Sequence, residues 1–121
     1  MKFTKMHGLG NDFLVIDARG MHGVDFNALA PQLCDRHTGV GGDGLLLVQN
    51  SDTADVRMRI VNSDGSEAEM CGNGIRCFAK YVYEQGVVKK TAFSVETLAG
   101  VMRPALLIED GAVTGVRVDM G

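Results

Sequence analysis

A cysteine inside a glycine-rich segment is the part of the sequence best suited to chemistry. Residues 62–74 read NSDGSEAEMCGNG, and the last four, Cys71 to Gly74, directly precede a stretch with helical spacing. The first N–H groups of a helix have no intrahelical acceptor and bind anions, and a helix N-terminus also favours the thiolate form of cysteine. Cys71 is therefore a candidate base or nucleophile, with a small buried thiol as the alternative interpretation.

The other two cysteines, Cys34 and Cys77, are expected to belong to the core. Cys77 follows Cys71 by six residues, which is about 240° around a helix, so the two thiols cannot share one site. Cys34 lacks a glycine-rich setting. Three cysteines at irregular spacing fit neither a disulfide scaffold nor a CxxC motif, and the histidines show no metal-ligand spacing. We predict no metal site.

Two asparagines are further candidates for binding a ligand. Asn62 continues the inward positions of an alternating segment at residues 56–60, and an inward amide needs a hydrogen-bond partner from a ligand or from nearby backbone. Asn11 lies in the segment GLGNDF at residues 8–13, which reads as a loop feeding a strand. Its amide has two interpretations, a ligand donor or a turn cap, and the loop alone favours the cap.

A second glycine-rich segment matches the pattern of a dinucleotide-binding loop. Residues 39–44 read GVGGDG, which satisfies GxGxxG. That fingerprint needs a strand before it and a helix after it, whereas here a predicted helix precedes and the strand-like residues 45–48 follow. We interpret the segment as a turn that shapes a pocket, and we predict no cofactor.

The predicted elements form an α+β domain. We expect helices at about residues 27–37, with Pro31 near the first turn, and at about residues 71–85, with Gly86 as its stop. The expected strands are residues 13–18, 45–48, 56–62, 91–98, 101–109 and 113–119, with a hairpin turn at residues 110–111 and an edge or bulge at Pro104. The second helix has so little polar surface that we predict a mainly antiparallel sheet curled around it as a central helix.

Length, charge and hydropathy exclude several classes of protein. The chain has 121 residues, enough for one domain and one core, and its formal charge of −3 comes without a lysine or arginine cluster. We therefore expect no nucleic-acid partner. The apolar runs are too short to span a bilayer and the first residues do not resemble a signal peptide, so we expect no membrane partner and a cytoplasmic location.

Three segments taken together resemble the diaminopimelate epimerase family. They are GLGNDF at residues 8–13, DRHTGVG at residues 35–41 and NSDGSEAEMCGNGIRC at residues 62–77, and their order and spacing agree with the family. The resemblance implies a cofactor-independent isomerase that interconverts LL- and meso-diaminopimelate in lysine and peptidoglycan-precursor biosynthesis. Members have two pseudo-symmetric domains and commonly form homodimers. It therefore implies that residues 1–121 are the amino-terminal domain and that the carboxy-terminal domain is absent.

The resemblance also implies roles for single residues. In the family each domain contributes one catalytic cysteine, and the pair acts on opposite faces of the α-carbon; Cys71 matches the first. Asn11 and Asn62 match positions that hydrogen-bond the substrate, and the backbone at Gly72 and Asn73 matches the site of its α-carboxylate. Some members have a substrate-contacting glutamine where this chain has Gly44. With the second cysteine missing, we expect the isolated domain to be inactive.

Three alternatives remain at this point. Proline racemases and phenazine-pathway isomerases share the overall fold that the resemblance implies. A non-catalytic module that binds small carboxylates would use the same helix end at residues 72–74. A redox sensor centred on Cys71 ranks lower, because no resolving cysteine accompanies it within the motif.

Overall fold

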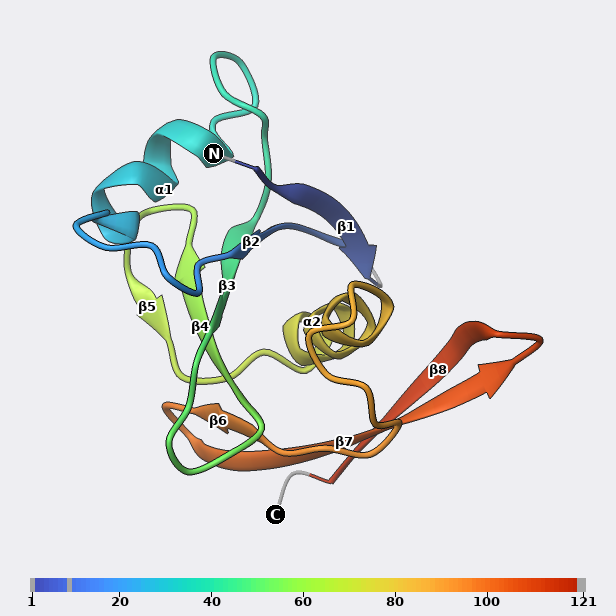
Figure 1. Cartoon of the computed structure of the whole chain (residues 1–121). Helices are drawn as coiled ribbons and strands as arrows, with labels where there is room; N and C mark the ends of the chain where they lie inside the picture. The colour runs from blue at the N-terminus through green and yellow to red at the C-terminus, as the bar shows by residue number, and fades with distance from the viewer. Residues whose placement is uncertain (1, 9, 120–121) are drawn as a thin grey trace.

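A single curled sheet surrounds one helix, and a second helix covers the outside of the sheet (Figure 1). The computed structural model describes residues 2–8 and 10–119. The helices are α1 (Phe26–Cys34) and α2 (Gly72–Glu84). The strands are β1 (Thr4–Gly8), β2 (Asn11–Asp17), β3 (Gly44–Gln49), β4 (Val56–Asn62), β5 (Glu67–Ala68), β6 (Val95–Thr97), β7 (Gly100–Glu109) and β8 (Ala112–Asp119). The α+β class is confirmed.

The sheet is mixed, with antiparallel pairs in the majority. Its strand order is β1-β2-β3-β4-β6-β7-β8, and β5 pairs separately with β4. Only the pairs β2/β3 and β4/β6 among the described strands are parallel. Parallel neighbours need a long crossover, and here each crossover contains a helix, α1 for the first pair and α2 for the second. The two helices thus lie on opposite faces of the sheet.

Helix α2 forms the centre of the main core. Its side chains Ile75, Phe78, Ala79 and Val82 are 0% exposed, which confirms the helical spacing read from the sequence. They pack with the inward side chains of the sheet, including Leu46. A second core lies between α1 and the outer side chains of β2, β3 and β4. Strands β2 and β3 are thus covered on both faces, so their sequences are continuous apolar runs rather than alternating ones.

Helix α1 is shorter than predicted at its C-terminal end. It stops at Cys34 because the Asp35 carboxylate accepts the backbone N–H groups of His37, at 2.7 Å, and Thr38, at 3.1 Å, in a turn. Asp25 caps its start by accepting the N–H of Ala28 at 3.1 Å. Pro31 lies in the middle of the helix and not in its first turn, so the predicted position of that proline was wrong.

The segment read as a loop at residues 8–13 belongs to a tight hairpin instead. Gly8 in β1 pairs with Asn11 in β2, and Gly10 has a φ of +93°, a conformation that glycine adopts without strain. Strand β1 was missed because it is an edge strand whose residues Thr4, Lys5 and His7 are exposed, so it lacks an alternating apolar pattern.

Pro104 explains why the predicted strand at residues 91–98 is reduced to β6. The Phe93 N–H donates to the Pro104 carbonyl at 3.2 Å, but proline has no N–H to complete the pair. The ladder is interrupted there and continues only as the isolated bridge between Ala92 and Ala105. The proline thus marks a break in the ladder between β6 and β7. The register shift lies elsewhere, in the hairpin of β7 and β8 between Leu107 and Ile108.

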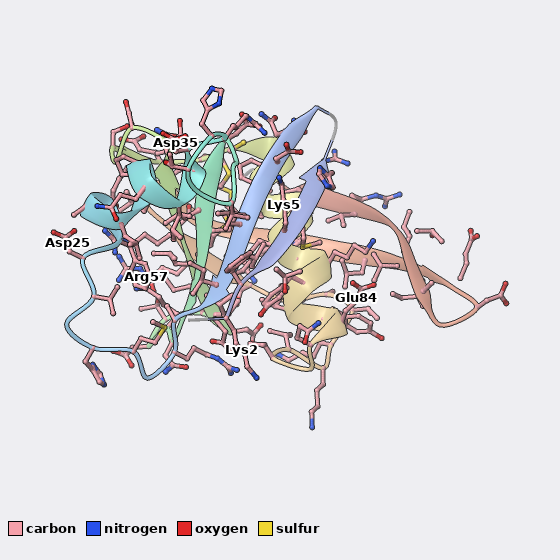
Figure 2. All side chains as sticks on the ribbon, turned by 90° about the horizontal axis from the view of Figure 1, so that it is seen from above. Lys2, Lys5, Asp25, Asp35, Arg57 and Glu84 are labelled. Atoms are coloured by element: carbon pink, nitrogen blue, oxygen red, sulfur yellow. The ribbon has the colours of Figure 1, made fainter. Side chains whose placement is uncertain are left out.

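Charged side chains are exposed on several sides of the described part of the fold. Exposed charged side chains such as Lys2, Asp25 and Glu84 project from the periphery of the fold (Figure 2). Within residues 2–8 and 10–119, no helix is both long and apolar enough to cross a membrane. The same residues contain no group of three histidine, cysteine or acidic side chains able to hold a metal ion.

Candidate active site at the start of helix α2

The starts of β2 and β3 and the end of β4 lie side by side at one end of the sheet, next to the start of α2. Phe13 near the start of β2 pairs with Gly44 at the start of β3, and Gly44 pairs in turn with Asn62 at the end of β4. Asn11 reaches the helix directly, since its Oδ1 accepts a hydrogen bond from the Asn73 side chain at 2.8 Å. The fold therefore gathers at this end the residues that the sequence singled out separately.

Cys71 is the N-cap residue of α2. Its backbone is extended, with φ −144° and ψ 118°, and its Sγ accepts the N–H of Gly74 at 3.4 Å. Its carbonyl accepts the first intrahelical bond, from Ile75 N–H at 2.9 Å. The thiol is half-buried and lies at the N-terminal end of α2, the positive end of the helix dipole.

The amides of Gly72 and Asn73 precede Ile75, the residue whose N–H makes that first intrahelical bond. Helical N–H groups at these positions have no acceptor within the helix, so they are available to an anion. A Cβ added to Gly72 would meet no atom within 4 Å apart from its chain neighbours and the helix's own backbone, so there is open space beside this residue. The helix start can therefore receive a carboxylate next to the Cys71 thiol.

Asn62 has its hydrogen-bond partner within the turn that follows β4. Its Nδ2 donates to Ser66 Oγ at 3.1 Å, and its backbone N–H donates to the Ser66 carbonyl at 2.7 Å. It follows the inward, α2-facing positions Met58 and Ile60, as predicted. A Cβ added to Gly44 would lie 2.9 Å from the Val61 carbonyl oxygen, so glycine allows β3 to begin close against β4.

The remaining cysteines belong to the core, as predicted. Cys34 and Cys77 are each 5% exposed, and burial raises the pKa of both thiols. Cys77 Sγ packs so closely on β1 that a Cβ added to Gly8 would lie 2.8 Å from it. Neither thiol is available to act beside Cys71.

Sequence reasoning missed two charged residues beside this site, Arg36 and Asp43. Asp43 Oδ2 accepts the backbone N–H of Asp12 at 2.7 Å, and Arg36 donates to Asp12 at 3.1 Å and to Asp43 at 3.3 Å. The Asp12 pKa is lowered by its hydrogen bonds to His7 and to Arg36. The available signals were Asp43 as a charged residue inside the glycine-rich segment 39–44 and Arg36 inside the segment DRHTGVG at residues 35–41.

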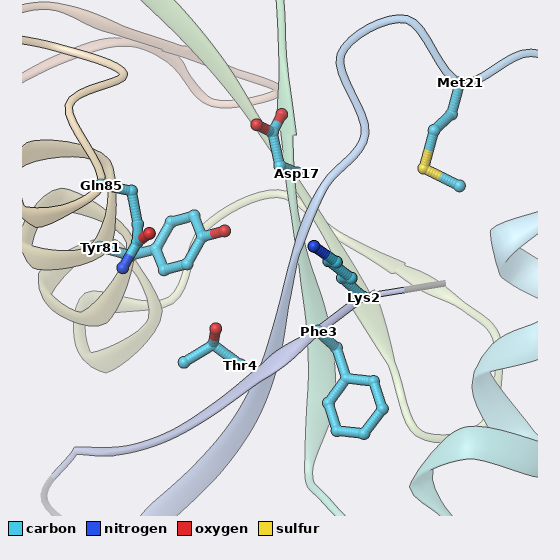
Figure 3. Close-up of a pocket in the computed structure, with 7 residues that line it drawn as sticks. All are labelled: Lys2, Phe3, Thr4, Asp17, Met21, Tyr81 and Gln85. Atoms are coloured by element: carbon cyan, nitrogen blue, oxygen red, sulfur yellow. The ribbon is translucent and has the colours of Figure 1, made fainter.

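A cavity of about 590 Å³ lies at the opposite end of α2 (Figure 3). It is lined by Lys2, Asp17, Tyr81 and Gln85 among others, near the beginning of β1 and the end of α2. Cavity size would favour this end of α2 as a binding site, whereas the residues suited to chemistry lie at the other end. We assign the candidate site to the start of α2, because that end holds the half-buried thiol and two amides that have no acceptor inside the helix.

Comparison with known proteins gives a consistent family. The family model described as diaminopimelate epimerase matches residues 3–121. A diaminopimelate epimerase from Caldanaerobacter subterraneus subsp. tengcongensis is 64% identical over 121 residues, which are 100% of this chain and 43% of that protein. One from Pelotomaculum thermopropionicum is 62% identical over 123 residues, covering 100% and 44%. The chain thus spans less than half the length of these relatives.

Solved structures share the fold at low sequence identity. A probable proline racemase from Agrobacterium radiobacter K84, with bound carbonate, matches with a TM-score of 0.75 and 20% identity over 96% of this chain and 40% of that one. A hydroxyproline epimerase from Agrobacterium vitis, with bound trans-4-hydroxy-L-proline, matches with a TM-score of 0.75 and 19% identity over the same shares, 96% and 40%. At such identity these matches establish the fold alone.

Proposed function

The chain belongs to the diaminopimelate epimerase family, and from that premise we propose that it supplies one half of an acid/base pair interconverting LL- and meso-diaminopimelate. The observation that carries the proposal is the position of Cys71. Its thiol caps α2 beside the uncommitted amides of Gly72 and Asn73. One short segment thus offers a candidate base and, beside it, a candidate carboxylate site.

The reaction is a proton exchange at the α-carbon. The Cys71 thiolate takes the α-proton, so the C–H bond breaks, an S–H bond forms, and the electron pair spreads into the carboxylate. The amides of Gly72 and Asn73 would stabilise this charge, and the adjacent helix dipole would act in the same direction. A second thiol on the other face then gives its proton to the α-carbon. The reverse direction exchanges the roles of the two thiols.

The second thiol must come from outside residues 1–121. Cys34 and Cys77 are buried in the two cores and cannot face a substrate at the start of α2. A single base returns the proton to the face that it left, so Cys71 alone cannot invert the centre. We therefore propose that residues 1–121 act as the amino-terminal domain of a two-domain epimerase and that this chain alone does not turn over diaminopimelate.

A fusion experiment tests both parts of the proposal. Residues 1–121 are produced alone and joined to the remaining part of the Caldanaerobacter relative, and epimerisation of LL-diaminopimelate is followed by proton NMR in D₂O. We expect inversion by the fusion and none by the chain alone. Cys71→Ser should lower the rate of the fusion by about 10²–10⁴-fold, the usual contribution of a general acid/base group. Cys77→Ala is the control, and it should retain activity wherever the fold persists.

Two results would contradict the proposal. Inversion by the isolated chain carrying Cys34→Ala and Cys77→Ala would show that no second thiol is needed. A fusion that binds diaminopimelate, exchanges no α-proton and is indifferent to Cys71→Ser would favour the non-catalytic carboxylate-binding module. Proline in place of diaminopimelate tests the proline racemase alternative, which rests on the shared fold.

A further inference from the structure

Asp43 joins the two strand ends that carry the candidate ligand-binding residues Asn11 and Asn62. Its backbone N–H donates to the Asp12 carbonyl at 2.7 Å, and its carbonyl accepts the N–H of Ser63 at 3.2 Å. Asp12 follows Asn11, and Ser63 follows Asn62. The backbone of Asp43 thus holds the start of β2 and the end of β4 together. Asp12 lies 31 residues before it and Ser63 lies 20 residues after it along the chain.

The side chain of Asp43 acts on Asn11 separately from these backbone bonds. A single carboxylate oxygen, Oδ2, accepts the Asp12 N–H at 2.7 Å and faces Asn11 Nδ2 at 3.5 Å. A carboxylate only accepts hydrogen bonds, so the NH₂ group of Asn11 must point toward Asp43 and its carbonyl must point away. That carbonyl, Oδ1, accepts from Asn73 Nδ2 at 2.8 Å.

This chain of contacts determines which hydrogen-bonding groups the site presents. With its carbonyl committed to Asn73, Asn11 keeps one side-chain N–H without a partner among the described residues, and so does Asn73. A flipped Asn11 would instead place its carbonyl against the Asp43 carboxylate, which is unfavourable. The orientation therefore provides donors beside the α2 amides, as a carboxylate ligand requires.

Arg36 balances the charge that this arrangement introduces. Two carboxylates near an anion site would repel a carboxylate ligand, and Arg36 bridges both of them, Asp12 at 3.1 Å and Asp43 at 3.3 Å. The guanidinium is about half exposed, so its attraction is screened by solvent. Its contribution is to neutralise the carboxylates more than to add stability.

We propose that Asp43 is a positioning residue for ligand binding at the start of α2. Its carboxylate fixes the orientation of the Asn11 amide and, through it, of the Asn73 amide. The inference rests on the proposed function for the identity of the ligand, diaminopimelate, but the orientation of the amides is independent of it. Asp43 itself acts through Asn11 and is not assigned a contact with the reacting atoms.

Three variants separate the acceptor role from the structural role. Asp43→Ala removes the side-chain acceptor and leaves both backbone hydrogen bonds in place. Asp43→Asn keeps an oxygen that can occupy the position of Oδ2. Asp55→Ala is the matched control, because Asp55 also accepts a backbone N–H from a distant part of the chain, that of Ser94 just before β6, at 2.9 Å and away from the site.

The first measurement is the hydrogen exchange of assigned side-chain amides in the ¹⁵N-labelled chain. We expect Asp43→Ala to accelerate exchange of the Asn11 and Asn73 amide protons by about tenfold, the equivalent of one hydrogen bond. Asp43→Asn should stay close to the unmodified chain, and Asp55→Ala should not change these rates. Unchanged exchange in Asp43→Ala, or an equal acceleration in Asp43→Asn, would overturn the proposed orientation.

The second measurement is the protection of Cys71 from iodoacetamide by LL-diaminopimelate, in the fusion protein described above. Asp43→Ala should raise the concentration that gives half-protection by about tenfold, and Asp43→Asn should restore it. An unchanged concentration in Asp43→Ala would overturn the role in ligand binding. Absence of protection in the unmodified fusion would instead refute the proposed function, while the exchange measurement would still judge the orientation.

Discussion

Replacing Gly74 with alanine tests how closely the start of α2 packs around the Cys71 thiol. A Cβ at this position would lie 3.3 Å from Cys71 Cβ, 3.3 Å from Leu46 Cδ2 and 3.6 Å from Cys71 Sγ. Leu46 is 0% exposed within β3, so it has little freedom to move aside. Gly72, two residues earlier in the same helix, has nothing within 4 Å of such a Cβ and supplies the matched control.

The two substitutions share one energetic contribution and differ in another. Alanine for glycine within a helix gains up to about 1 kcal/mol of stability from backbone propensity. Crowding in a packed core costs about 1–3 kcal/mol. Gly72→Ala gains the first contribution only, whereas Gly74→Ala receives both. The difference between the two variants therefore approximates the crowding alone, about 1–3 kcal/mol in favour of Gly72→Ala.

Urea unfolding followed by circular dichroism measures this difference directly. We expect Gly72→Ala to unfold at a higher urea concentration than the unmodified chain, and Gly74→Ala at a similar or lower one, with equal m-values. In the fusion protein, Gly72→Ala should also bind diaminopimelate more weakly, because its methyl group occupies the open space beside the amide. Equal stabilisation by both substitutions would show that the helix start is not closely packed around Cys71.

Two further predictions concern titrating groups. Burial raises the pKa of Cys34 and Cys77, so iodoacetamide at pH 8 should modify Cys71 much faster than these two thiols in the folded chain. Unfolding in urea should remove the difference between the three rates. Rapid labelling of Cys77 in the folded state would contradict this prediction. Hydrogen bonds from Ser94 N–H and then from Lys90 lower the Asp55 pKa below 3.8, so Asp55 stabilises the fold above about pH 4 and less as the pH falls below it. Asp55→Asn should therefore flatten the dependence of the urea midpoint between pH 5 and pH 2, and an unaltered slope would count against it.

The sequence predicted the elements whose buried side chains recur at regular spacing along the chain. Helix α2 was identified with its start and its stop, because its inward side chains repeat with the helical period. Strand β4 was identified because alternate residues face α2. Strand β1 was missed because an exposed edge strand has no apolar period, and β5 because two residues carry none. The interruption of the ladder at Pro104 depends on which residue of the neighbouring strand lies opposite the proline, and no local sequence pattern reveals that pairing.

The same limit applies to the candidate site. Cys71 could be singled out because a thiol, two glycines and a helix start are adjacent in sequence. The contact between Asn11 and Asn73 joins residues 62 positions apart, and the contact between Asp12 and Asp43 joins residues 31 apart. Only the folded arrangement of three strand ends brings these groups together, so Asp43, which we propose to orient the site, is found by structure and not by motif.

The start of α2 departs from what helix stability alone would favour. Serine, threonine, aspartate and asparagine are the best N-cap residues, and Cys71 occupies that position with a weaker sulfur acceptor at 3.4 Å. Glycine is among the poorest helix formers, yet the first and third helical positions are Gly72 and Gly74. Close packing against Cys71 and Leu46 accounts for the second glycine but not for the first, since Gly72 faces open space. A cysteine cap and an unobstructed helix start therefore sacrifice stability without a structural reason, and the carboxylate ligand and catalytic thiol that we propose would supply the reason.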